Sequence, residues 1–163
     1  MTPAIRALYQ YWSCRKGDGI APSWGDSSGG DFKLVELDAD VLPLLAVVDV
    51  AGRPRDYVYR YWGTQRGEIL NTSDATGKTV GGSLVKSTVD RVVQQYREVV
   101  EAKVPLLVLN FFELRNGLVA ELQTLRLPLS TDGETVDKVV SATAFLRHQE
   151  EFLREVSAEA GST

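Results

Sequence analysis

The chain has 163 residues, 44% of them hydrophobic and 25% charged, which is typical of one globular domain with short extensions. A net charge of −4 argues against nucleic-acid binding. The single cysteine excludes an internal disulfide, and with one histidine we expect no metal site. No apolar stretch reaches the roughly 18 residues that cross a membrane, and the chain does not begin with a signal-peptide pattern. We therefore expect a cytoplasmic protein without a membrane partner.

Residues 1–31 are predicted to form an extension made of a helix and a loop. Thr2 is a favoured N-cap and Pro3 suits the first helical position, so the helix is expected over 3–16. Residues 17–31 are rich in Gly and Ser, which predicts a loop. The apolar positions of the helix recur on one face, at Ile5, Leu8, Tyr9 and Trp12.

Residues 32–146 are predicted to be the domain proper, and residues 147–163 a helical tail. β-Branched and aromatic runs indicate strands, and Asn116-Gly117 is a strong hairpin signal. Gly63 ends the second strand where the chain turns into a helical segment, so a side chain there should be poorly tolerated. The expected elements are a helical turn after Asp38, strands 44–50 and 56–64, a short helix 65–70, a long helix 84–102 that Ser83 caps, and strands 106–114, 118–129 and 136–146.

The expected strands are apolar on both faces. In 136–146, Val139 and Phe145 lie on one side, and Val140 and Ala142 on the other. An antiparallel sheet with one wet face would alternate more cleanly. We therefore expect the second face to be covered, either by the N-terminal helix of the same chain or by that helix from a second subunit.

Catalytic patterns are absent from the sequence. Cys14 has no local histidine or aspartate partner, and His148 alone does not assemble a Ser/His/Asp triad. No carboxylate pair stands out for acid–base work. We therefore expect a protein that is not an enzyme.

Four segments together resemble a PAS domain, in particular the bacterial PAS-like subgroup with a leading N-terminal helix. They are LYQYWSCRKGDGIAP (8–22), DYVYRYWGT (56–64), DATGK (74–78) and LPLS with the following DG and Val136. The similarity covers about residues 5–146. It implies an α+β fold in which helices flank a five-stranded antiparallel sheet.

The resemblance also implies a function. PAS domains sense small ligands, light or redox state, and commonly form homodimers through flanking helices. The flavin-binding members carry a cysteine after the second strand and the haem-binding members a histidine on a central helix. The sequence has neither, so we expect neither flavin nor haem. The resemblance implies a stand-alone sensor that binds a small-molecule ligand between the sheet and the long helix. Such a sensor would signal through its homodimer or a separate signalling protein.

Two sets of residues follow as candidate sites. A buried arginine would suit a carboxylate or phosphate ligand through paired donors. The competing interpretation is that the tyrosines are core residues and the arginines pair with nearby carboxylates. The protein would then be a ligand-free dimerisation or interaction module. The candidate ligand-binding residues are Tyr59, Tyr61, Arg91, Tyr96, Asn110 and Arg126, and the candidate dimer interface comprises Ile5, Leu8, Tyr9 and Trp12.

Overall fold

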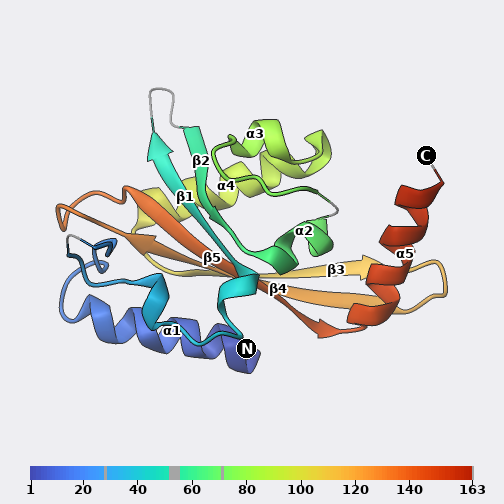
Figure 1. The fold of residues 1–163 in the computed structure, drawn as a ribbon, viewed down its shortest axis with the longest axis horizontal. Coiled ribbons are helices and arrows are strands. Elements are labelled where there is room, and N and C mark those ends of the chain that lie inside the picture. Colours follow the sequence, from blue (N-terminus) through green and yellow to red (C-terminus); the bar gives the residue numbers. More distant parts are fainter. Residues whose placement is uncertain (28, 52–55, 71, 163) are drawn as a thin grey trace.

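The computed structural model describes residues 1–27, 29–51, 56–70 and 72–162. Within these residues, five strands form one antiparallel sheet in the order β2-β1-β5-β4-β3 (Figure 1). This confirms the predicted α+β class. The strands are β1 (Leu45–Ala51), β2 (Asp56–Trp62), β3 (Leu106–Glu113), β4 (Val119–Leu129) and β5 (Lys138–Arg147), and the helices are α1 (Pro3–Lys16), α2 (Thr64–Leu70), α3 (Val80–Ser83), α4 (Lys86–Ala102) and α5 (Gln149–Gly161).

One face of the sheet is covered by the helices that connect β2 to β3. The long helix α4 buries Tyr96, Val99 and Val100 against this face, where they meet Val48 and Val139 of the strands. The helix ends at Ala102 and is capped by Lys103, which has a left-handed backbone and donates its N–H to the Val99 carbonyl. The apolar stripe therefore fixes both the position and the orientation of α4.

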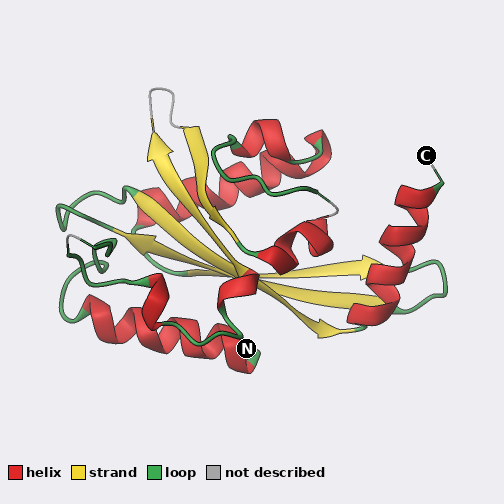
Figure 2. Ribbon diagram, viewed as in Figure 1, coloured by secondary structure: helices red, strands yellow, loops and turns green. Residues whose placement is uncertain are grey.

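The opposite face is covered by α1 of the same chain, as Figure 2 shows by the helices on both sides of the strands. The Thr2 side chain caps α1 by accepting the Ile5 N–H at 3.4 Å. Ile5 and Leu8 are fully buried against the sheet, and Trp12 donates from its indole nitrogen to the Pro128 carbonyl at 2.7 Å. Between the two alternatives left open by the sequence, the structure shows that the chain covers this face itself.

The segments before β1 and before α4 differ from the prediction. The expected turn after Asp38 is present, because the Val41 N–H donates to the Asp38 carbonyl at 2.9 Å, and it continues into the 3-10 helix Leu42–Leu44. A second 3-10 helix that the sequence did not predict, Leu34–Glu36, precedes it. The long helix begins at Lys86 instead of Leu84, because residues 80–83 form the separate short helix α3. Ser83 does not cap α4: its hydroxyl donates to the Thr79 carbonyl at 2.6 Å.

The helix α5 packs beside the β3–β4 hairpin, at the far end of the sheet from the loop of residues 17–31 (Figure 1). Its Phe152 ring lies 5.3 Å from the Phe112 ring and 5.2 Å from the Phe145 ring. Arg115 in the hairpin reaches two glutamates on the exposed side of α5. Among the described residues, no helix is long and apolar enough to cross a membrane.

Candidate ligand-binding cavity

A cavity of about 210 Å³ lies between the inner face of the sheet and the helices α2, α4 and α5. Strands β3, β4 and β5 form its floor, and Phe152 of α5 lies at one side. Its walls combine aliphatic and aromatic groups with hydroxyls, amides and arginines. The polar lining residues are Arg66, Thr88, Arg91, Gln95, Asn110, Thr124, Arg126 and Thr143, and the apolar ones are Ile69, Leu70, Val92, Phe112, Leu122 and Phe152.

Arg126 enters the cavity from the middle of β4. The residue is only 3% exposed, and its guanidinium contacts Gln95, Ser141 and Tyr96. Nε and Nη2 donate to the Gln95 amide oxygen at 3.0 and 2.7 Å, and Nη1 donates to the Ser141 hydroxyl at 2.9 Å. The guanidinium also lies 4.3 Å from the centre of the Tyr96 ring. The three hydrogen bonds run to two acceptors, both neutral oxygens, so none of these contacts compensates the positive charge of Arg126.

Arg66 reaches the same cavity from α2 and is 5% exposed. Its Nη1 donates to the Thr143 hydroxyl at 3.1 Å, and its guanidinium lies 5.2 Å from the Trp62 ring. Among the described residues, its Nε has no hydrogen-bond partner. Burial, and to a lesser degree the charge of Arg126, lowers the pKa of Arg66. An arginine keeps its proton in proteins, so the chain buries two positive charges close together.

No carboxylate compensates these charges. The ion pairs among the described residues involve neither Arg66 nor Arg126, and no Asp or Glu lines the cavity. The residues outside the described ranges include no Asp or Glu either. A cation–π contact gains about 2 kcal/mol when desolvated. Burying an ion costs several kcal/mol, so the aromatic rings offset only part of that cost.

Two tyrosine hydroxyls next to the arginines are also unpaired. Tyr59 and Tyr96 are buried, and neither hydroxyl makes a hydrogen bond of ordinary geometry within the described part of the chain, although the two hydroxyls lie close enough to interact with each other. Burial, reinforced by the neighbouring Tyr96, raises the pKa of Tyr59, while Arg66 and Arg126 act in the opposite direction. These mutual effects place the four side chains near one another. Donors that lack acceptors therefore gather at Arg66 and directly behind the cavity, at Tyr59 and Tyr96.

Five of the six residues predicted to bind a ligand lie at or directly behind this cavity. Arg91, Asn110 and Arg126 line it, and Tyr59 and Tyr96 lie behind it. Their role in binding stays a prediction.

Tyr61 lies elsewhere, on the face covered by α1, and its hydroxyl donates to the Leu42 carbonyl at 3.2 Å. The reason is a bulge: Tyr61 pairs with Val47 and Tyr59 with the adjacent Val48, so Arg60 is the extra residue. Residues two apart in a regular strand share a face, but the bulge turns Tyr59 and Tyr61 to opposite faces of the sheet.

Sequence reasoning missed the residues that hold the arginines. Arg66 was placed in a short helix without a function, and Gln95 was not distinguished from the polar side of the long helix. Ser141 and Thr143 fall within the expected strand 136–146, which gives them no role at a site. Polar residues at alternate positions of an apolar strand were the available signal, since Thr124 with Arg126 and Ser141 with Thr143 show that spacing.

The predicted dimer residues lie on α1, but three of the four are already used inside the chain. Ile5, Leu8 and Trp12 are between 0% and 2% exposed because they pack on the sheet, whereas Tyr9 is 36% exposed and stacks on Trp12. Of the four, only Tyr9 presents surface to a second subunit. Their participation in a dimer stays a prediction.

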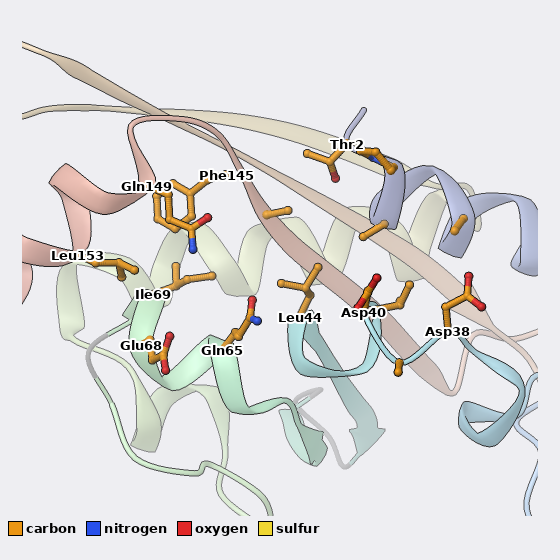
Figure 3. A pocket seen from close by; sticks show the side chains of 16 residues that line it. Thr2, Asp38, Asp40, Leu44, Gln65, Glu68, Ile69, Phe145, Gln149 and Leu153 are labelled. Carbon is orange, nitrogen blue, oxygen red and sulfur yellow. The ribbon is translucent and has the colours of Figure 1, made fainter.

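A second hollow lies on the other side of α2, as Figure 3 shows. This groove of about 770 Å³ runs between the start of α1, the segment before β1, α2 and α5. Asp38, Asp40 and Glu68 line it together with Gln65 and Gln149. The described residues contain no cluster of His, Cys, Asp or Glu that would hold a metal ion. These acidic groups have access to water, so the groove resembles an ordinary surface depression.

No protein-family model matches the sequence, and no curated protein matches it. Several solved structures resemble the chain. They include Vibrio cholerae VqmA, at 17% identity over 63% of this chain and 45% of that chain, with a TM-score of 0.49. The light-state LOV domain of Aureochrome1 matches at 11% identity over 74% and 94% of the two chains, with a TM-score of 0.46. A PAS domain from Colwellia psychrerythraea matches at 12% identity over 66% and 92%, with a TM-score of 0.44.

The chain spans about half the length of the VqmA chains that it matches. Its strand order, with helices inserted between the second and third strands, is that of a PAS-like fold, as the sequence resemblance implied.

Proposed function

We propose that this PAS-like domain is a sensory module that binds a small ligand in the cavity between β3–β5 and α4. The observation that supports this most directly is a cavity beside which buried guanidinium and hydroxyl donors lack acceptors. Native interiors rarely leave such groups unpaired, and a ligand would satisfy them. A packed interaction module would have no need of this arrangement.

The proposed action is binding without catalysis. The cavity lining among the described residues contains no carboxylate, histidine or cysteine. His148 lies at the start of α5, 3.8 Å from the Glu151 carboxylate, and Cys14 is exposed on α1. Neither residue lies where it would act on a ligand in the cavity.

Native mass spectrometry of freshly purified protein tests this function. The protein should carry a small molecule that is released on denaturation. Thr88 lines the cavity from α4, so Thr88→Phe should fill the space and remove the adduct. Ser87→Phe, at an exposed neighbouring position, is the matched control and should retain it. If the protein carries no adduct, and a mixture of small organic compounds leaves the NMR signals of cavity residues unchanged, the proposal fails.

We also propose that the domain forms a homodimer, because the outer face of β3 is apolar and uncovered. Asn110 and Phe112 face the cavity, so the alternating residues point to the opposite side. These are Leu107, Leu109 and Phe111, which are 45%, 52% and 62% exposed. A second copy of this edge would bury them, which favours a dimer centred on β3 over one built on α1.

Light scattering distinguishes these arrangements. The double variant Leu109→Ser, Phe111→Ser should convert a dimer to a monomer without unfolding it. Val85→Ser replaces an exposed valine just before α4, on another part of the surface, and should leave the dimer intact. A monomeric parent protein would contradict the dimer and leave the ligand proposal unaffected.

A further inference from the structure

We infer that the ligand is a small organic oxyanion, a carboxylate or a phosphate monoester with an apolar body, whose charged group binds at Arg66 and Arg126. This inference rests on the proposed function, because it assigns the chemical class of the ligand that the cavity would hold. Arg66 is the residue that the structure adds to the candidate site, because the sequence gives no reason to place it in the same cavity as Arg126.

The first argument is the charge of the site. Two arginines that are 5% and 3% exposed line one cavity, and their hydrogen bonds run only to neutral oxygens. Arg91 lies at the exposed side of the same cavity and adds a third positive group. A neutral ligand would leave this excess in place. An anion would compensate it inside a medium where the attraction is strong.

The second argument is the kind of donor that remains. Of its N–H groups, Arg66 uses only Nη1 in a hydrogen bond among the described residues, and its buried Nε has no acceptor. The hydroxyls of Tyr59 and Tyr96 are two further donors in the immediate neighbourhood. Carboxylate and phosphate oxygens accept several hydrogen bonds each, whereas a halide offers no directional match to a planar guanidinium.

The third argument is size and the character of the opposite wall. A volume of about 210 Å³ lies below the roughly 300–1,000 Å³ of sites for drug-sized ligands. Leu122, Phe112 and Phe152 line the side toward α5. A ligand with its anionic group at the arginines would therefore place a small apolar body, such as one ring, among these three side chains.

Sodium benzoate, phenyl phosphate and benzamide test the inference as probes. Benzoate and phenyl phosphate carry the two oxyanion types on the same ring, and benzamide is the neutral isostere of benzoate. We expect calorimetry and NMR titration at constant ionic strength, up to about 10 mM probe, to show binding of at least one anion and a much weaker response to benzamide. The arm that binds more tightly identifies carboxylate or phosphate as the natural head group.

Arg66→Met and Arg126→Met should each weaken the binding of the preferred anion by about 30-fold or more, since each removes a buried partner of the charge. Arg97→Met removes an arginine from α4 that does not line the cavity and should leave affinity unchanged. Thermal melting verifies that all three variants are folded.

The outcomes separate the two proposals. If benzamide binds in the cavity as tightly as the anions, the site binds ligands but not by charge, and only this inference fails. If the anions bind equally well to both arginine variants, the anion is held elsewhere and the inference also fails. If no probe binds and the purified protein carries no adduct, both the inference and the proposed function are wrong.

Discussion

The two hollows on either side of α2 differ in the sign and the exposure of their charged side chains, and this difference is more informative than their volumes. The groove beside α1 is the larger, at about 770 Å³ against about 210 Å³. Its charges, Asp38, Asp40 and Glu68, are exposed to water. The smaller cavity holds the buried Arg66 and Arg126. A single helix, α2, supplies Glu68 to the first and Arg66 to the second.

The difference is one of cost. A carboxylate in an open groove remains hydrated, so its presence needs no explanation. Removing a guanidinium from water without a counter-ion costs several kcal/mol of desolvation free energy, and its neutral neighbours offset only part of this cost. Since destabilising features persist where function requires them, the uncompensated charge is a better guide to a site than the size of a depression.

The largest expected effect comes from moving α2, which would disturb both hollows together. A side chain at Gly63, just before α2, would place its Cβ 2.4 Å from the Pro43 carbonyl oxygen and 2.6 Å from that of Leu42. These are backbone atoms, which cannot move away as easily as a flexible side chain. Gly63→Ala should therefore lower the unfolding free energy by about 3 kcal/mol. Urea titration measures this loss.

Gly81→Ala is the matched control, because a Cβ there meets no atom within 4 Å. If Gly63→Ala is as stable as Gly81→Ala, the close approach of β2 and the Leu42–Leu44 turn is not a real constraint.

The next effect concerns α5, which borders both hollows. Phe152 packs on Phe112 and Phe145 and is buried, so Phe152→Ala should cost about 3 kcal/mol or slightly less. It should also enlarge the cavity and shift the preferred anion toward larger rings. Leu153 faces the groove instead, and Leu153→Ala should leave the choice of ring unchanged. Equal effects of the two variants on ligand choice would show that α5 does not shape the cavity.

A smaller effect, of opposite sign, should come from removing a buried charge. Arg66→Met keeps much of the volume and removes an uncompensated guanidinium, so the ligand-free protein should become about 1–2 kcal/mol more stable. The lost hydrogen bond to Thr143 and the contact with Trp62 limit the gain. Glu68→Gln, on the groove side of α2, should change stability by less than about 0.5 kcal/mol. A clear loss of stability in Arg66→Met would mean that Arg66 is a structural residue.

Much of the fold could be predicted because it follows from local patterns. Capping at Thr2, the apolar face of α1 and the Asn116-Gly117 turn each act over a few residues, and the structure agrees at all three. The start of α4 could not be placed, since Leu84 and Val85 continue the apolar pattern although the helix begins at Lys86. Periodicity alone does not distinguish such a connection from a helical turn.

The candidate site was predictable only in outline. Arg126 and Asn110 could be placed opposite a long helix because strand alternation is local. Arg66 reaches the cavity through the docking of α2, and the bulge at Arg60 separates Tyr59 from Tyr61. Both features depend on contacts between elements distant in the sequence, which one sequence does not display.

The smallest expected effect comes from Asp132, whose carboxylate is an exposed charge with a full set of hydrogen bonds. It accepts from the Glu134 and Thr135 amides and from the hydroxyls of Ser130 and Thr135. These bonds, that of the Thr135 hydroxyl first, hold the pKa of Asp132 well below its usual 3.8. A lowered folded-state pKa means that the carboxylate stabilises the fold above about pH 3.8 and that this contribution is lost as the pH falls through the folded-state value. Asp132→Asn should therefore be less stable than the parent near pH 7, with a difference in melting temperature that shrinks toward about pH 2. Glu134→Gln, in the same turn, is the matched control for loss of an exposed negative charge. A constant difference at every pH would mean that the turn depends on the shape of Asp132 and not on its charge, and that satisfied and unsatisfied charges in this protein are less distinct than the two hollows suggest.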